Sequence, residues 1–178
     1  PIFECLGWTE SLRQQNLSPR GREDVPDGLL FADAAAKAQA NGFPQEWKRY
    51  EFGLAVVESK RWLRPLDRRS GRRGEETAPS TQMLRYLRRV DDVTTGKLRW
   101  GLLTNGARWR LYYQGARSVS EQLFEMDRGA VLELPGQNDG LFAISTTDRL
   151  HRVKGFALIV RSEACMPGAE WESTRGKS

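Results

Sequence analysis

The stretch that decides the fold is residues 51–60, which read Glu51-Phe52-Gly53-Leu54-Ala55-Val56-Val57-Glu58-Ser59-Lys60. Its apolar residues fall on both faces of an extended chain, and they are β-branched toward the end. This pattern is typical of a central strand that is buried on both sides. Residues two apart on a strand point to the same side, so Glu58 and Lys60 project together. Charged side chains rarely lie on a buried strand unless they are paired or functional, so the stretch also predicts a site.

The segments around this strand indicate a mixed α/β domain. Asn105-Gly106 between two apolar runs predicts a β-hairpin, and Pro79 is a residue that helices accept in their first turn, with Gly96 a plausible stop. In chain order we expect the end of a helix within 2–15, a polar stretch at 16–26, strand 27–33, a connection at 34–50, strand 51–60, a loop at 61–76, a helix from Pro79 to about Gly96, strands 98–104 and 107–113, and a strand at 121–126. This order predicts a mixed sheet flanked by helices.

The carboxyl-terminal third carries a weaker pattern. Residues 153–165 fit either a helix or a strand, and residues 167–178 are polar. We therefore expect a core over residues 1–128 and an extension over residues 129–178 that connects toward a downstream domain. Because the chain begins at Pro1 without an initiator methionine, we interpret it as a fragment of a larger protein.

Composition narrows the classes of function. The 178 residues suit one domain, and the formal net charge is +5, with basic residues that are mostly arginine. An arginine-rich basic domain fits a polyanionic partner, because the guanidinium binds phosphate in a bidentate manner. A GC-rich genome gives the same composition, so charge alone leaves both explanations open.

Several chemistries are excluded or disfavoured by single residues. The only histidine is His151, which rules out a zinc site with several histidines, and we expect it at the surface. Cys5 and Cys165 form neither a disulfide framework nor a zinc pattern. There is no apolar run of membrane-spanning length and no secretion signal at the amino end, so we expect a cytoplasmic protein without a membrane partner.

Three short motifs carry the chemistry: Pro26-Asp27, Glu58-Ser59-Lys60 and Gln82-x-x-x-Tyr86. If the first two strands pair, Asp27 and Glu58 converge on one site, and Mg²⁺ prefers carboxylates, waters and substrate phosphate. Such an ion generates a nucleophilic hydroxide, and a nearby ammonium stabilises developing negative charge. Gln82 and Tyr86 share a helix face one turn apart.

Together these motifs resemble the signature of the PD-(D/E)XK nucleases. The Gln82-x-x-x-Tyr86 pair resembles the additional motif of RecB-like nucleases and of type I restriction subunits. The segment 79–113, with its Thr104-Asn105-Gly106, is similar to the stretch after the catalytic strand in those subunits and in the amino-terminal nuclease domains of type IIG/IIL restriction–modification enzymes. The resemblance covers roughly residues 2–127, and a weaker similarity extends over residues 156–168.

The resemblance implies a restriction-endonuclease-like core that acts as a Mg²⁺- or Mn²⁺-dependent endonuclease on double-stranded DNA in a bacterial restriction–modification or phage-defence enzyme. It also implies a downstream methyltransferase or specificity/translocase domain, and homodimers for double-strand cleavage. Asp27 and Glu58 would be metal ligands with the Ser59 carbonyl, Lys60 would be catalytic, and Gln82 and Tyr86 would support the site. Either Glu4 or Glu10 is a candidate for a further acidic residue from the first helix.

An arginine-rich loop follows the central strand. It predicts a rim that contacts DNA phosphates, or alternatively a solvated loop; Trp62 within it is a candidate DNA wedge, although packing is the simpler interpretation. The arginines are Arg61, Arg64, Arg68, Arg69, Arg72 and Arg73, with Arg85, Arg88 and Arg89 following on the helix. Two other functions stay open: a DNA-binding module of nuclease fold with little activity, and an unrelated α/β protein-interaction domain.

Overall fold

The computed structural model describes residues 2–21, 24–72, 76–128 and 146–166. Its elements, in chain order, are α1 (Ile2–Cys5), β1 (Ser11–Arg13), β2 (Gly28–Leu30), α2 (Ala34–Asn41), the 3₁₀ helix η1 (Glu46–Phe52), β3 (Ala55–Ser59), α3 (Pro79–Thr94), β4 (Trp100–Thr104), β5 (Arg108–Tyr113), β6 (Phe124–Asp127), α5 (Thr146–Val160) and the 3₁₀ helix η2 (Ser162–Cys165). None of the helices in this part of the chain is long and apolar enough to cross a membrane.

The six strands form one mixed sheet in which spatial order follows chain order, β1-β2-β3-β4-β5-β6. Neighbouring strands are antiparallel except β3 and β4, which are parallel and are joined through α3. A parallel pair needs such a crossover, whereas antiparallel neighbours need only short turns. The predicted α/β class, with a mixed central sheet flanked by helices, is confirmed, and β3 lies between β2 and β4 as a central strand.

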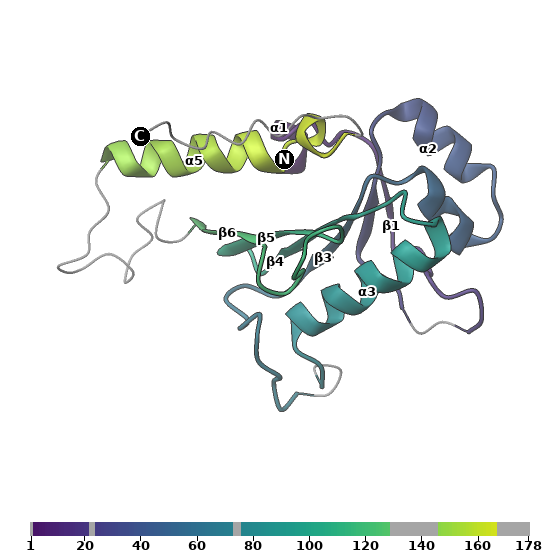
Figure 1. The fold of residues 1–178 in the computed structure, drawn as a ribbon, viewed down its shortest axis with the longest axis horizontal. Coiled ribbons are helices and arrows are strands. Elements are labelled where there is room, and N and C mark those ends of the chain that lie inside the picture. Colours follow the sequence, from purple (N-terminus) through teal and green to yellow (C-terminus); the bar gives the residue numbers. More distant parts are fainter. Residues whose placement is uncertain (1, 22–23, 73–75, 129–145, 167–178) are drawn as a thin grey trace.

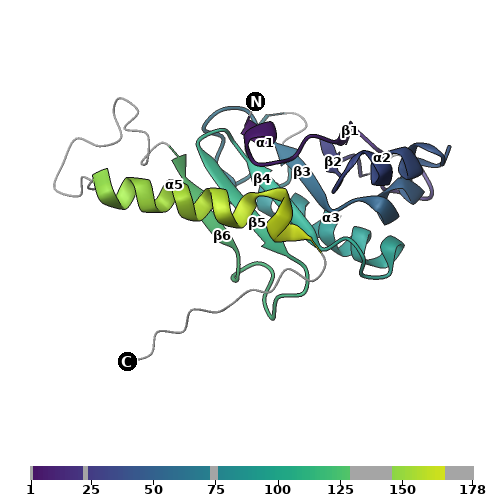
Figure 2. The same cartoon turned by 90° about the horizontal axis from the view of Figure 1, so that it is seen from above.

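Helices cover both faces of the sheet (Figure 1). Helix α3 packs on one face, where Met83, Leu87 and Val90 bury against Val56 and Leu103. Helix α5 lies along the other face, where Phe156 and Val160 belong to a second cluster, and Figure 2 shows its long axis running across the sheet. The strands alternate between these two cores, so Val57 faces α5 while Val56 and Glu58 face α3.

The amino-terminal third differs from the sequence prediction. The 34–50 connection contains α2, whose first turn is capped by Asp33: its Oδ1 accepts a hydrogen bond from the Ala36 N–H at 2.8 Å. The 51–60 strand is shorter than predicted, because η1 continues through Phe52. The region 2–15 holds only one short helix and then β1, a strand that the sequence reading missed. Edge strands of three residues leave too little alternation to be recognised.

The carboxyl-terminal elements agree better with the sequence. Helix α3 begins at Pro79, and it ends at Thr94 before two left-handed residues, Thr95 and Gly96. The β4–β5 hairpin turns through Asn105 and Gly106. Residues 153–165, which fitted either element, are helical in α5 and η2. The predicted extension 129–178 therefore includes helix α5, which shares a core with the sheet; residues 129–145 and 167–178 lie outside the described residues.

Candidate active site at the end of the central strand

Asp27 and Glu58 are placed together by the pairing of β2 with β3. The antiparallel register aligns Gly28 with Val57, and its next step sets Asp27 opposite Glu58. Opposite residues of an antiparallel pair point to the same face, which here is the face covered by α3. The N–H of Ser59 donates a hydrogen bond to Oδ2 of Asp27 at 2.7 Å. This bond fixes the Asp27 carboxylate at the end of β3.

Glu58 is a buried acid with an ammonium partner. Only 3% of the residue is exposed, and Lys60 Nζ forms an ion pair with its Oε1. Burial raises the pKa of Glu58; the Lys60 hydrogen bond and charge lower that pKa, and the negative charge of Asp27 raises it. Within the described part of the chain, Oε2 of Glu58 has no hydrogen-bond partner. A buried carboxylate oxygen without a partner is costly, and such oxygens favour a cation.

Helix α3 brings the third motif to the same place. The Gln82 side-chain amide donates to the Tyr86 hydroxyl at 2.5 Å, and Tyr86 is buried. Burial, together with the negative charge of Glu58, raises the pKa of Tyr86 to about 12. The phenol therefore stays protonated at physiological pH and keeps an O–H to donate. Tyr86 packs in the same core cluster as Val56, which lies two residues before Glu58 on the same face of β3.

Asp24 was not identified from the sequence, although it is one of the most buried acids. It is 1% exposed and forms ion pairs with Arg85 Nε at 2.9 Å and Arg89 Nη1 at 2.8 Å. These two arginines were predicted to contact phosphate, and the structure shows that they join α3 to the segment before Asp27. Their spacing of four residues placed them on one helix face, but nothing in the sequence indicated which acid they would meet.

The arginine-rich loop divides into exposed and buried members. Arg61, Arg68, Arg69 and Arg72 are exposed, as a phosphate-contacting rim requires. Arg64 is 3% exposed, and its Nη2 donates to the Thr77 carbonyl. The prediction that Arg64 contacts DNA therefore does not agree with the structure, because its side chain is buried. Its guanidinium is directed into the protein to satisfy a backbone carbonyl. Arg73 lies outside the described residues.

The loop is attached to the sheet through Asp67. Arg110 on β5 donates from Nη1 and Nη2 to the two Asp67 oxygens at 2.6 and 2.7 Å, and it also binds Glu125. The bidentate contact lowers the pKa of Asp67. Near Asp67 the loop is therefore held against β5, unlike the solvated loop that the sequence left open as an alternative.

The residues at this end of β3 suit a small hard cation. No cluster of three or more histidine, cysteine or acidic side chains occurs in the described ranges, and the carboxylates that the structure brings together at this point are Asp27 and Glu58. Mg²⁺ is commonly held by one or two carboxylates with waters and phosphate completing its shell. Oε2 of Glu58, which has no hydrogen-bond partner among the residues that the structure describes, is the atom that fits such an ion best.

The fold and the site define a mixed α/β protein with a carboxylate–lysine cluster at the end of its central strand, beneath a tyrosine–glutamine pair on the crossover helix. Comparisons of the chain with protein-family models, with characterised proteins and with solved structures return no significant match. The function is therefore inferred from the geometry of the site.

Proposed function

We propose that this chain is a metal-dependent DNA endonuclease domain with a restriction-endonuclease-like core, acting by phosphodiester hydrolysis within a bacterial restriction or phage-defence enzyme. The observation that carries the proposal is the convergence of Asp27, Glu58 and Lys60 on one face at the end of β3. Asp27 comes from the segment just before β2, and Glu58 and Lys60 come from the end of β3, so two separate segments of the chain supply the residues that support the proposal.

Each residue has a role that follows from its surroundings. Asp27 and Glu58 would hold Mg²⁺ or Mn²⁺, with the Ser59 carbonyl as a further ligand. When bound, the ion supplies charge neutralisation for the scissile phosphate and lowers the pKa of a bound water. Lys60 would orient the attacking water and stabilise the negative charge that develops on the phosphate oxygens. Tyr86, held by Gln82, would donate its O–H to a phosphate or water oxygen.

The remaining charges suit a DNA partner. The exposed arginines of the loop follow the site directly in the chain and would contact backbone phosphates on either side of the cut. Such contacts make affinity fall with increasing salt. Sequence recognition and any methyl transfer or translocation would belong to other domains, and homodimerisation would permit cleavage of both strands.

A DNA-binding module that does not cleave is the second candidate. It is favoured by the direct ion pair between Lys60 and Glu58, which occupies one oxygen that a metal would use. The two candidates differ in metal binding. Only a nuclease requires Lys60 to release Glu58 so that the carboxylate can bind a cation.

Metal binding to the purified full-length protein tests the proposal. Isothermal titration with Mn²⁺ should show a site that is lost in Glu58→Gln and retained in Glu51→Gln, a matched change at an exposed glutamate. Mg²⁺-dependent nicking of supercoiled plasmid should follow the same pattern. Unaltered Mn²⁺ binding in Glu58→Gln would contradict the assignment, and DNA binding without metal uptake would favour the second candidate.

A further inference from the structure

A tight turn directly after Lys60 displays two large apolar side chains. The N–H of Arg64 donates to the Arg61 carbonyl at 3.1 Å, which closes a four-residue turn with Trp62 and Leu63 at its centre. These two side chains are 49% and 53% exposed. Turn centres usually carry glycine, asparagine or other small polar residues, so an exposed tryptophan–leucine pair is unexpected on stability grounds.

The backbone of this turn is strained. Leu63 has φ 59°, in the left-handed region that favours glycine and asparagine and disfavours a bulky apolar residue. Strain of this kind persists only where the surroundings impose it, and it concentrates at functional positions. A glycine or asparagine here would relieve the strain. Stability of the turn therefore does not account for a leucine at this position.

The surroundings that impose the turn come from the β4–β5 hairpin. The Leu63 N–H donates to the Asn105 carbonyl at 3.2 Å, and the buried Asn105 side-chain amide donates to the Arg64 carbonyl at 2.7 Å. The Trp62 ring packs against Gly106, where an added Cβ would lie 2.4 Å from the ring. The turn is thus held in place while roughly half of each apolar side chain remains exposed.

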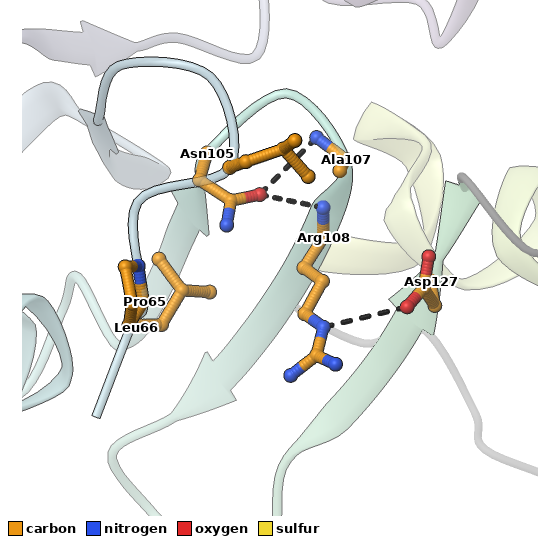
Figure 3. Close-up of a pocket in the computed structure, with 7 residues that line it drawn as sticks. Pro65, Leu66, Asn105, Ala107, Arg108 and Asp127 are labelled. Carbon is orange, nitrogen blue, oxygen red and sulfur yellow. Dashed lines mark hydrogen bonds and ion pairs between the residues drawn. The ribbon is translucent and has the colours of Figure 1, made fainter. Parts of the chain in front are cut away.

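This turn lies beside the candidate active site. The N–H of Lys60 donates to the Thr104 carbonyl at 2.7 Å, so the strand end that bears Glu58 and Lys60 adjoins the hairpin that holds the turn. A pocket of about 220 Å³ opens between Leu63, Leu66 and the hairpin, and Arg108 and Asp127 pair at its edge (Figure 3). Apolar surface, a cavity and polar groups therefore adjoin the position where a phosphate would react.

The charges of the loop favour one occupant. Arg61, next to Trp62, and Arg68 and Arg69, beyond the Asp67 attachment, are exposed. Cationic groups beside an aromatic ring and an apolar wedge are the combination by which proteins contact phosphate and stack on a base together. An apolar peptide would use Trp62 and Leu63 but would offer the exposed arginines no negative charge.

We propose that the Trp62–Leu63 turn inserts against an unstacked DNA base next to the scissile phosphate, with the pocket beneath Leu63 receiving the displaced base. This inference rests on the proposed function, because it takes DNA as the partner. It assigns to the turn a positioning role: stacking would fix the register of the strand so that one phosphate meets Lys60 and the two carboxylates.

Equilibrium binding of a fluorescent duplex to the full-length protein, without divalent metal so that no cleavage occurs, tests the inference. Trp62→Ala should weaken binding roughly five- to hundred-fold, the range for losing one stacked base, and Trp62→Phe should restore most of it. The slope of log Kd against log salt should stay unchanged, because no phosphate contact is lost. Arg69→Ala should instead reduce that slope by about 0.9.

A second variant separates stacking from folding. Leu63→Asn suits the left-handed backbone, so we expect an unfolding temperature no lower than that of the wild type, together with several-fold weaker DNA binding. Leu158→Ala, at an equally exposed leucine on α5, is the control and should leave DNA binding unchanged.

Three results would overturn the inference. If Trp62→Ala and Leu63→Asn bind DNA like the wild type while Arg69→Ala binds more weakly, the turn does not stack on DNA, and the nuclease proposal is unaffected. If Trp62→Ala lowers the salt slope as Arg69→Ala does, the loss is electrostatic. If the wild type shows no salt-dependent DNA binding, both proposals are wrong.

Discussion

The backbone N–H of Ser59 donates a 2.7 Å hydrogen bond to Oδ2 of Asp27, so the two strands that carry the candidate site are joined through the acid itself. The strand register sets Asp27 opposite Glu58, so under the proposed function Asp27 would have both a structural role and a metal-binding role. These two contributions can be separated by substitution.

Asp27→Asn should fold normally and lose metal binding. The asparagine carbonyl can still accept from Ser59, whereas the negative charge that attracts a cation is gone. Asp27→Ala removes the acceptor as well, and it should lower the free energy of unfolding by about 0.5–1.5 kcal/mol, the net contribution of a typical hydrogen bond whose donor can turn to water. Urea unfolding and Mn²⁺ titration distinguish the two effects. Equal stability of both variants would show that the hydrogen bond contributes nothing.

The raised pKa of Glu58 predicts a pH dependence of stability. Because the folded state favours the protonated acid, the wild type should lose stability as pH rises from the ordinary glutamate value through the raised pKa. Glu58→Gln mimics the protonated form and should lack this loss. Its stability relative to the wild type, from urea unfolding without metal, should therefore increase between pH 4 and pH 8. A constant difference over that range would contradict the raised pKa.

Bound metal should stabilise the folded wild type more at high pH than at low pH, which opposes the loss of stability expected without metal. A cation binds the deprotonated carboxylate, so protons compete with it, and its binding becomes tighter as pH rises. Added Mn²⁺ should increase the unfolding temperature of the wild type more at pH 8 than at pH 5. Glu58→Gln should show little increase at either pH. An equal increase in the variant would place the metal elsewhere.

Asp24 should contribute to stability through its two arginines. Asp24→Ala leaves Arg85 and Arg89 without their buried partner, and we expect a loss of about 1.5–3 kcal/mol in the free energy of unfolding. Asp92→Ala is the control, at an exposed position on α3, the helix that carries the two arginines. It should change the free energy of unfolding by less than about 0.5 kcal/mol. A similar small change in both variants would show that the network is not stabilising.

Gly101 sets the distance between β4 and α3. A Cβ at this position would lie 2.7 Å from Met83 Sδ and 3.2 Å from Leu87, so Gly101→Ala should destabilise the protein by about 1–3 kcal/mol through overpacking. Gly155→Ala on α5 is the matched control, since its Cβ would meet nothing within 4 Å and alanine favours a helix. Thermal unfolding should therefore shift in opposite directions for the two variants.

The attachment of the arginine-rich loop can be followed by proteolysis. Asp67→Ala removes the bidentate contact with Arg110, so trypsin should cut after Arg68 and Arg69 faster than in the wild type. The pKa of Asp67 is lowered, so this contact is retained until pH falls through that lowered value. Glu121→Ala, an exposed acid outside the loop, should leave the rate unchanged. No acceleration in Asp67→Ala would show that the loop is held by other contacts.

Sequence reasoning located the central strand because Val56 and Val57 continue an apolar run that only a buried strand requires. It found the crossover helix and the hairpin because Pro79 and Asn105-Gly106 act through local backbone preferences. It missed α2 and β1, since an alanine-rich helix of low amphipathicity and a three-residue edge strand have little periodicity of their own. Tertiary contacts decide such elements.

The sequence named Asp27, Glu58, Lys60, Gln82 and Tyr86 as candidates through strand and helix spacing and through the resemblance of the motifs. The structure brings Asp27, Glu58 and Lys60 together at the end of β3, and their function stays a prediction. The burial of Arg64 and the pairing of Arg85 and Arg89 with Asp24 depend on residues far apart in the chain. An arginine-rich segment has the same sequence whether its side chains contact solvent, DNA or a buried acid.

The most direct measurement is the initial rate of supercoiled-plasmid nicking by the full-length protein in Mg²⁺, compared among the wild type, Lys60→Met and Lys97→Met. Lys97 is an exposed lysine on the chain segment after α3 and serves as the matched control. We predict nicking that requires Mg²⁺, falls by at least about a hundred-fold in Lys60→Met, as expected on loss of one group that stabilises the transition state, and is unchanged in Lys97→Met. Equal nicking by Lys60→Met and the wild type would contradict the account.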